Sequence, residues 1–133
     1  MEDNCFKIKE CTDKFLDKYK QNKEIEMFNL GCSNKGNNRT LYVYDEAKDE
    51  KPLAFLSISL EEKCLEIDEF EVIKSQRKKG IGQAIISNIQ QNKETNCIQL
   101  YAQDNISKKF WEKCGFLPED DGYGTELMVW RKE

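Results

Sequence analysis

A short turn rich in lysine, arginine and glycine has the residue types of a phosphate-binding site. It spans residues 76–82, reads Gln-Arg-Lys-Lys-Gly-Ile-Gly, and is called the cradle below. Gly80 and Gly82 remove side chains where backbone N–H groups at the start of a helix can converge on an anion. Arg77 and the two lysines after it add positive charge in a chain whose net charge is −4. The sequence therefore predicts a local binding turn for an anionic ligand.

The strand expected directly before the cradle changes its apolar face part-way along. Its apolar residues fall at odd positions, Leu65 and Ile67, and then at even positions, Phe70 and Val72. A regular strand cannot do this, because alternate side chains point to opposite faces. One extra residue near Asp68 or Glu69 repairs the pattern, which predicts a β-bulge that splays the strand from its neighbour and opens a slot for an extended ligand. The plainer interpretation is a half-exposed edge strand with a chance change of pattern.

Three carboxylates on this strand, which we expect over residues 64–73, are the candidates for base chemistry. The chain contains no histidine, so a general base must be sought among other side chains. Glu69, Glu66 and Glu71, in that order of preference, tend towards the face opposite the apolar residues. Crowding of like charges beside a partly buried slot is expected to raise the pKa of at least one of them. The alternative is that these glutamates are solvated or only attract a cationic ligand.

The remaining pattern predicts the elements that would position the cradle and the carboxylates. Strand-like segments lie at residues 6–9, 40–44, 53–60, 64–73, 97–102, 116–118 and 125–130. Apolar residues at helical spacing follow a predicted N-cap at Thr12 and recur over residues 80–89 and 106–114. A shorter helical or irregular piece is expected over residues 25–31. This order predicts an α+β fold with a mixed, mainly antiparallel central sheet of six to seven strands and about four helices. The helix after the cradle is expected to cross over to a parallel strand.

Length and composition limit the kinds of function. The 133 residues suit a single domain, 1–133, and contain no run of about 18 apolar residues. No signal-peptide core is found at the amino terminus, so we expect a soluble, cytoplasmic protein with no membrane partner. The acidic net charge argues against a nucleic-acid partner, which would need a basic surface. In a cytoplasmic protein we expect reduced cysteines at positions 5, 11, 32, 64, 97 and 114. With no histidine and no C-x-x-C pair, we expect no metal site.

Two segments resemble signatures of the GNAT N-acetyltransferase superfamily. The sequence Arg-Lys-Lys-Gly-Ile-Gly over residues 77–82 resembles its acetyl-CoA signature, Arg/Gln-x-x-Gly-x-Gly/Ala. Downstream, Phe-Trp-Glu-Lys-Cys-Gly-Phe over residues 110–116 is similar to its late Phe-Tyr-x-x-x-Gly-Phe segment. The order of elements agrees across nearly the whole chain, with the amino-terminal helices matched only loosely. On these residues the chain is identified as a member, which implies a GNAT-like acyl-CoA N-acyltransferase fold.

The resemblance implies that acetyl-CoA, as co-substrate, lies in the slot between the bulged strand and the strand at residues 97–102. Backbone groups of that bulged strand would pair with the pantetheine arm, and the cradle amides would hold the pyrophosphate. The family often has an asparagine near the pantetheine, and Asp104 or Asn105 could match that position. The implied cofactor-binding residues are Phe70, Val72, Arg77, Lys78, Lys79, Gly80, Ile81, Gly82, Asn105 and Trp111.

One position departs from the family pattern. Many members use the tyrosine of the Phe-Tyr segment to protonate the leaving thiolate, and Trp111 stands there in this chain. An indole N–H cannot supply that proton near neutral pH. Tyr101, Tyr123 or water would have to act instead, or the thiolate leaves without an acid. Trp111 itself is interpreted as an aromatic side chain packed against the cofactor or the core.

The resemblance implies an N-acetyltransferase that moves an acetyl group directly from acetyl-CoA to a primary amine of a small molecule or a protein. Glu119, Asp120 and Asp121, with the carboxylates around the bulge, would attract a cationic amine acceptor. A cysteine-linked acetyl-enzyme through Cys64 or Cys114 is the rival route, but neither thiol has an activating histidine. The alternative function is a non-catalytic CoA-binding sensor or interaction module of the same fold. The sequence identifies neither the acceptor nor whether the chain forms a homodimer.

Overall fold

The computed structural model describes residues 5–26, 32–62, 64–124 and 126–133. Within these residues the chain forms seven strands, three α-helices and one 3-10 turn. The strands are β1 (Phe6–Glu10), β2 (Asn38–Asp45), β3 (Asp49–Leu60), β4 (Leu65–Val72), β5 (Cys97–Tyr101), β6 (Leu117–Pro118) and β7 (Leu127–Arg131). The helices are α1 (Asp13–Gln21), α2 (Ile81–Gln90) and α3 (Asn105–Lys113), and the 3-10 turn η1 (Lys74–Gln76) precedes α2.

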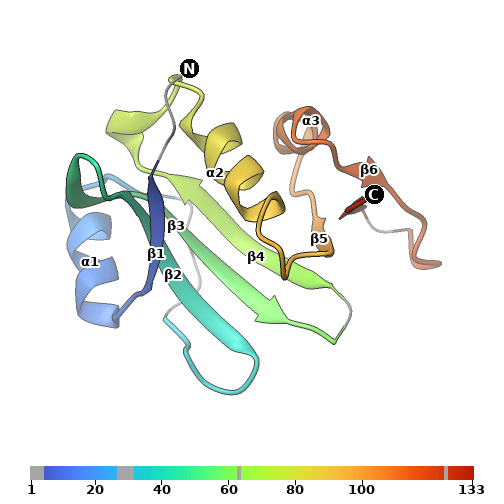
Figure 1. Ribbon diagram of the computed structural model, residues 1–133, viewed down its shortest axis with the longest axis horizontal. Coiled ribbons are helices and arrows are strands. Elements are labelled where there is room, and N and C mark those ends of the chain that lie inside the picture. Colours follow the sequence, from blue (N-terminus) through green and yellow to red (C-terminus); the bar gives the residue numbers. More distant parts are fainter. Residues whose placement is uncertain (1–4, 27–31, 63, 125) are drawn as a thin grey trace.

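All seven strands belong to one sheet, in the order β1-β2-β3-β4-β5-β7-β6 (Figure 1). Neighbouring strands are antiparallel except β4 and β5, which run parallel because α2 crosses over between them. The predicted fold class, a mixed and mainly antiparallel sheet of six to seven strands, is confirmed. The described residues hold three α-helices rather than about four. The piece predicted over residues 25–31 lies outside the described residues from position 27 onward.

The helix α1 covers one face of the sheet and is fixed there by aromatic packing. Thr12 caps the helix as predicted, since its Oγ1 accepts a hydrogen bond from the Phe15 backbone N–H at 3.3 Å. The Phe15 ring packs against Tyr19 and Tyr42, with centroids 5.3 and 4.7 Å away. Phe55 of β3 is fully buried in the same cluster. The apolar stripe of α1 therefore holds this helix against the middle of the sheet.

The helices α2 and α3 cover the opposite face. The apolar stripe of α2 buries Ile85, Ile86 and Ile89 in the main core, together with Leu56 of β3. Leu56 directly follows Phe55, so the two side chains point to opposite faces of the strand and belong to two separate clusters. Figure 1 shows α1 standing apart from α2 and α3. The sheet is therefore the middle of three layers.

The end of α3 agrees with the sequence pattern. The helical spacing predicted over residues 106–114 is followed by Gly115, which has a φ of 93° directly after the C-cap Cys114 and so suits the C′ position. The left-handed backbone there turns the chain into β6. None of the helices in the described part of the chain is both long and apolar enough to span a lipid bilayer.

Cys64 and Cys97 form a disulfide, which corrects the expectation that all six cysteines are reduced. Cys64 directly precedes β4 and Cys97 begins β5, and the two strands pair side by side from Leu65 and Ile98. The parallel register thus brings together two residues 33 positions apart, with their Cα atoms at 4.6 Å. Disulfides persist in oxidising surroundings, whereas the reduced state had been expected from a cytoplasmic location.

Reducing this disulfide should lower the free energy of unfolding by about 3 kcal/mol, because the bond removes loop entropy from the unfolded chain. Urea denaturation with and without a thiol reductant measures the difference. The Cys64→Ser/Cys97→Ser double variant is the control and should be insensitive to the reductant. A wild-type protein whose stability is the same in both conditions would contradict the assignment of this bond.

Candidate active site

The bulge predicted in β4 is present and is centred on Asp68. Ser57 of β3 pairs with Glu69, and the next residue, Ile58, pairs with Ile67. Asp68 is therefore the extra residue between two regular register pairs. The change of apolar parity along β4 is the sequence trace of this insertion.

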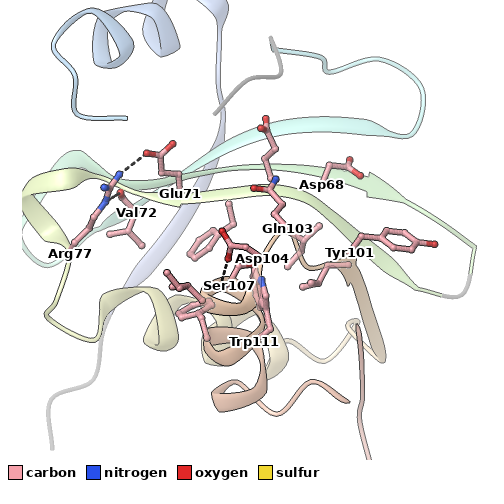
Figure 2. Close-up of a pocket in the computed structure, with 15 residues that line it drawn as sticks. Asp68, Glu71, Val72, Arg77, Tyr101, Gln103, Asp104, Ser107 and Trp111 are labelled. Atoms are coloured by element: carbon pink, nitrogen blue, oxygen red, sulfur yellow. Dashed lines mark hydrogen bonds and ion pairs between the residues drawn. The ribbon is translucent and has the colours of Figure 1, made fainter. Parts of the chain in front are cut away.

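Beyond the bulge, β4 and β5 separate and a cleft opens between them. Among the described residues the two strands pair at two register positions, Leu65 with Ile98 and Glu66 with Gln99. The cleft has a volume of about 490 Å³, and its walls come from β4, from the end of β5 and the segment after it, and from α3 (Figure 2). It is lined by Ile67, Asp68, Glu69, Phe70, Glu71, Val72, Arg77, Leu100, Tyr101, Gln103, Asp104, Ile106, Ser107, Phe110 and Trp111.

An aromatic cluster forms the α3 side of the cleft. The ring of Phe70 lies 6.2 Å from Phe110 and 6.0 Å from Trp111, and the last two rings meet edge to face at 4.9 Å. Trp111 also packs edge to face against Phe116 and is 7% exposed. The side chain at the position where the family often has a tyrosine is thus part of the core and also borders the cleft.

The backbone of β4 presents hydrogen-bonding groups to the cleft at Phe70 and Val72. The Ile73 N–H donates to the Leu53 carbonyl of β3 at 2.9 Å. Successive residues of a strand direct their backbone groups to opposite sides, so those of Phe70 and Val72 point away from β3. The Val72 carbonyl already accepts a hydrogen bond from Arg77 Nε at 2.9 Å. An extended ligand would therefore meet the groups of Phe70 and the N–H of Val72.

The cradle is a tight turn that leads from η1 into α2. Lys78 and Gly80 have left-handed backbone, with φ of 64° and 75°, and Gly80 is the N-cap of α2. The first N–H groups of a helix have no acceptor within it, so they can meet an anion. Gly82 serves packing instead, since a Cβ there would lie 3.2 Å from Val72 Cγ2 and 3.3 Å from the Phe110 ring. The two glycines thus have different physical roles.

The structure brings only part of the implied cofactor-binding set to the cleft. Phe70, Val72, Arg77 and Trp111 line it. The lining does not include Asn105. It also does not include five cradle residues of the implied set, Lys78, Lys79, Gly80, Ile81 and Gly82. Asp104, the competing match for the asparagine, does border the cleft, and its Oδ1 accepts the Ser107 N–H at 2.7 Å as the N-cap of α3.

Two of the three predicted carboxylates border the cleft. Glu69 lies beside the bulge, and Glu71 lies nearer the cradle. The Glu71 side chain is 8% exposed, and its Oε2 accepts a hydrogen bond from Arg77 Nη2 at 2.6 Å. Figure 2 shows this ion pair at one end of the cleft. This charge-assisted hydrogen bond fixes the Arg77 guanidinium beside β4.

Glu66 lies outside the cleft lining, and its surroundings change its acidity. Its Oε1 accepts a hydrogen bond from Gln99 Nε2 at 2.8 Å. Burial raises the pKa of Glu66, and the neighbouring Asp68 carboxylate raises it further, whereas the Gln99 amide opposes the change. The expected rise in pKa for at least one of the three glutamates is therefore found at Glu66.

Sequence reasoning missed Asp68 as a cleft residue. The pattern located the bulge to within one residue, but an inserted residue has no regular face, so the direction of its side chain could not be predicted. In the structure the Ser59 hydroxyl donates to Asp68 Oδ2 at 2.7 Å. The carboxylate is thereby held at the rim of the cleft, where Figure 2 shows it.

Of the two predicted proton donors, Tyr101 lines the cleft and Tyr123 does not. Figure 2 shows the Tyr101 ring at the end opposite Arg77. Tyr101 is 47% exposed, whereas Tyr123 is 86% exposed in the link between β6 and β7. Of the carboxylates expected near that link, Glu119 forms an ion pair with Arg131 and lies outside the cleft lining.

Neither cysteine of the rival acetyl-enzyme route is a ready nucleophile. Cys64 is bonded to Cys97 and has no free thiol. Cys114 is buried at the end of α3, and burial raises the pKa of its thiol to about 11. A thiol with such a pKa is protonated near neutral pH and reacts slowly. These surroundings favour direct transfer over a cysteine-linked intermediate.

The sequence model of the acetyltransferase (GNAT) family matches residues 7–116. This span includes α1, the bulged strand, the cradle, the parallel crossover and α3. Among curated proteins, none matches the sequence significantly.

Solved structures of similar fold cover nearly the whole chain. The Escherichia coli protein YhhK, solved with bound coenzyme A, is 17% identical, with a TM-score of 0.66 over 98% of this chain and 100% of that chain. An acetyltransferase from Thermus thermophilus is 14% identical, with a TM-score of 0.68 over 99% and 100%. A spermidine N-acetyltransferase SpeG chimera from Vibrio cholerae and hSSAT is 13% identical, with a TM-score of 0.67 over 96% and 95%. At these identities the likeness shows the fold.

Gly80→Ala should weaken the binding of coenzyme A about tenfold, because a side chain disfavours the left-handed backbone that aims the cradle amides and hydrogen bonds to charged groups are strong. Gly36→Ala is the matched control, since Gly36 is also left-handed, with φ of 57°, and a Cβ there meets nothing within 4 Å. Calorimetric titration measures the affinities. Equal affinities for both variants would contradict a binding role for the cradle.

Proposed function

The chain belongs to the acetyltransferase (GNAT) family, and from this premise we propose that it moves an acetyl group from acetyl-CoA to a primary amine of a small molecule or a protein. The transfer is direct and takes place within the single domain formed by residues 1–133. The observation that carries the proposal is the separation of β4 from β5 just beyond the bulge, beside a turn suited to a diphosphate. A long, flexible thioester needs both features, one for its arm and one for its charge.

The cradle and the cleft together suit the successive parts of acetyl-CoA. The pyrophosphate would meet the amides of residues 78–82 and the positive charge of Arg77, Lys78 and Lys79. The pantetheine arm, which carries amide groups, would pair with the backbone of Phe70 and Val72. The thioester end would then lie further from Arg77, towards the bulge and the Tyr101 end of the cleft (Figure 2).

Acetyl-CoA supplies a thioester carbon to which the amine nitrogen forms a bond while the C–S bond breaks and the sulfur leaves as a thiolate. An alkylammonium has no free electron pair, so the amine must first lose a proton. Glu69 is the first candidate to accept it, directly or through water, because it borders the cleft beside the bulge. Glu66 lies outside the lining, and Glu71 is held by Arg77, so both are placed after Glu69.

Tyr101 is the candidate donor of a proton to the thiolate. Trp111 cannot take this role, because an indole does not release its proton near neutral pH. Tyr101 carries a phenol, borders the cleft, and comes from the last residue of β5.

The acceptor is proposed to be a cationic amine. Asp68 and Glu69 place negative charge along the β4 side of the cleft, which attracts cations, whereas Glu71 is paired with Arg77. Polyamines belong among the first compounds to test, since one protein of similar fold is a spermidine N-acetyltransferase. The family of the chain favours a transferase over a non-catalytic CoA-binding module. The cytoplasmic location, self-association and the lack of a nucleic-acid partner stay predictions.

A screen for thiol release from acetyl-CoA across polyamines, aminoglycosides, amino acids and peptides tests the proposed function. At least one amine should release CoA well above the hydrolysis blank and gain one acetyl group by mass spectrometry. Glu69→Gln should slow that reaction about 100-fold or more, the usual contribution of a general base, with little change in CoA affinity. Binding of acetyl-CoA without release of CoA by any amine would favour the non-catalytic module instead.

Tyr101→Phe should slow the transfer about tenfold to 100-fold, because the leaving thiolate loses its proton donor while the ring still fills its place. Tyr123→Phe is the matched comparison and should keep the wild-type rate, since Tyr123 lies outside the cleft lining. The turnover number at saturating acetyl-CoA is the quantity to compare. Equal rates for Tyr101→Phe and wild type would remove Tyr101 from the mechanism.

A further inference from the structure

The guanidinium of Arg77, in the cradle, is held by β4. Its Nη2 donates to Glu71 Oε2 at 2.6 Å, and its Nε donates to the Val72 carbonyl at 2.9 Å. The Arg77 side chain is 37% exposed and borders the cleft, whereas the Glu71 side chain is 8% exposed. A guanidinium has five N–H donors, so these two contacts leave it able to donate to a diphosphate as well.

The same carboxylate oxygen also binds a distant part of the chain. Glu71 Oε2 accepts a hydrogen bond from the Glu26 backbone N–H at 2.8 Å, across 45 positions of sequence. Two further contacts reinforce the connection, because the Lys74 N–H donates to the Glu24 carbonyl at 2.8 Å and Lys74 Nζ lies 3.3 Å from Glu26 Oε1. Residues 24–26 are therefore fastened to the segment that leads from β4 into the cradle.

These contacts connect the two faces of the sheet. The cradle leads into α2, whose apolar stripe lies in the main core on one face. Residues 24–26 follow α1, and Ile25 is buried in the cluster of α1 on the other face, beside Ile73. The contacts through Arg77, Glu71 and Glu26 therefore join the segment that carries the cradle to a segment packed against α1.

We propose that Glu71 is a positioning residue that couples the two faces: through Arg77 and the Glu26 amide, a diphosphate bound at the cradle orders residues 24–26 on the α1 face of the sheet. The inference rests on the proposed function, because it needs a donor with a diphosphate. Coupling of this kind is reciprocal, so an ordered segment at residues 24–26 also favours the arrangement of Arg77 that meets the donor. Glu71 is thereby assigned to positioning, and Glu69 remains the candidate base.

Hydrogen exchange of the Glu26 backbone amide, followed with and without coenzyme A, tests the coupling. In the wild-type protein, coenzyme A should slow this exchange about fivefold, a typical size for coupling between two sites. In Glu71→Gln and in Arg77→Gln the slowing should fall below about twofold, because either change breaks the ion pair. Glu10→Gln is the matched control, since it breaks the Glu10–Arg39 pair at the far edge of the sheet, and it should keep the full effect.

The outcomes separate this inference from the proposed function. Coenzyme A that binds the wild-type protein but leaves Glu26 exchange unchanged, or slows it equally in both variants, would overturn the coupling and leave the function standing. Failure of the wild-type protein to bind coenzyme A in the parallel calorimetric titration would overturn both. Melting temperatures confirm that each variant is folded. If Glu71→Gln unfolds, Arg77→Gln decides, because that side chain is more exposed and its loss leaves less of the core disturbed.

Discussion

The inability of β4 to pair with β5 along its whole length is the constraint on which the rest of the site depends. One extra residue, Asp68, shifts the register of β4 against β3, and the pairing with β5 is found at Leu65 and Glu66, before that residue. Backbone groups on the β5 side of β4 are costly to bury unpaired. A ligand that can pair with them, entering a cleft of about 490 Å³, would satisfy them. The bulge thus creates the space and also the binding groups.

The second feature of the site is the placement of its charges. The cradle gathers cations at the start of α2, although the whole chain has a net charge of −4. Carboxylates lie along β4, before the cradle in the chain. Arg77 of the cradle pairs with the nearest of them, the buried Glu71. The proposed anionic donor and cationic acceptor would therefore meet separate parts of the site, the donor at the cradle and the acceptor along the carboxylates. The apolar α3 side, built around Phe70, Phe110 and Trp111, carries little charge.

Much of the fold could be predicted because local patterns decided it. The parity change in β4, the cap at Thr12 and the glycine after α3 each have one favoured structural solution, and each is found. The site was harder to predict, since its details depend on contacts between distant segments. The Cys64–Cys97 bond follows from a parallel register, and the bond from the Glu26 amide to Glu71 spans 45 positions. Neither contact joins residues at a sequence spacing from which it could be predicted.

We propose the cleft between β4 and β5, with the cradle at its end, as the acyl-CoA site. Titration of the isotopically labelled protein with coenzyme A, followed by the backbone amide signals in NMR spectra, tests it most directly. The largest shifts are expected at the amides of Phe70, Val72 and residues 78–82, with small changes in β1 and β2. Shifts concentrated elsewhere, or no saturable shifts at Phe70 and Gly80, would contradict it.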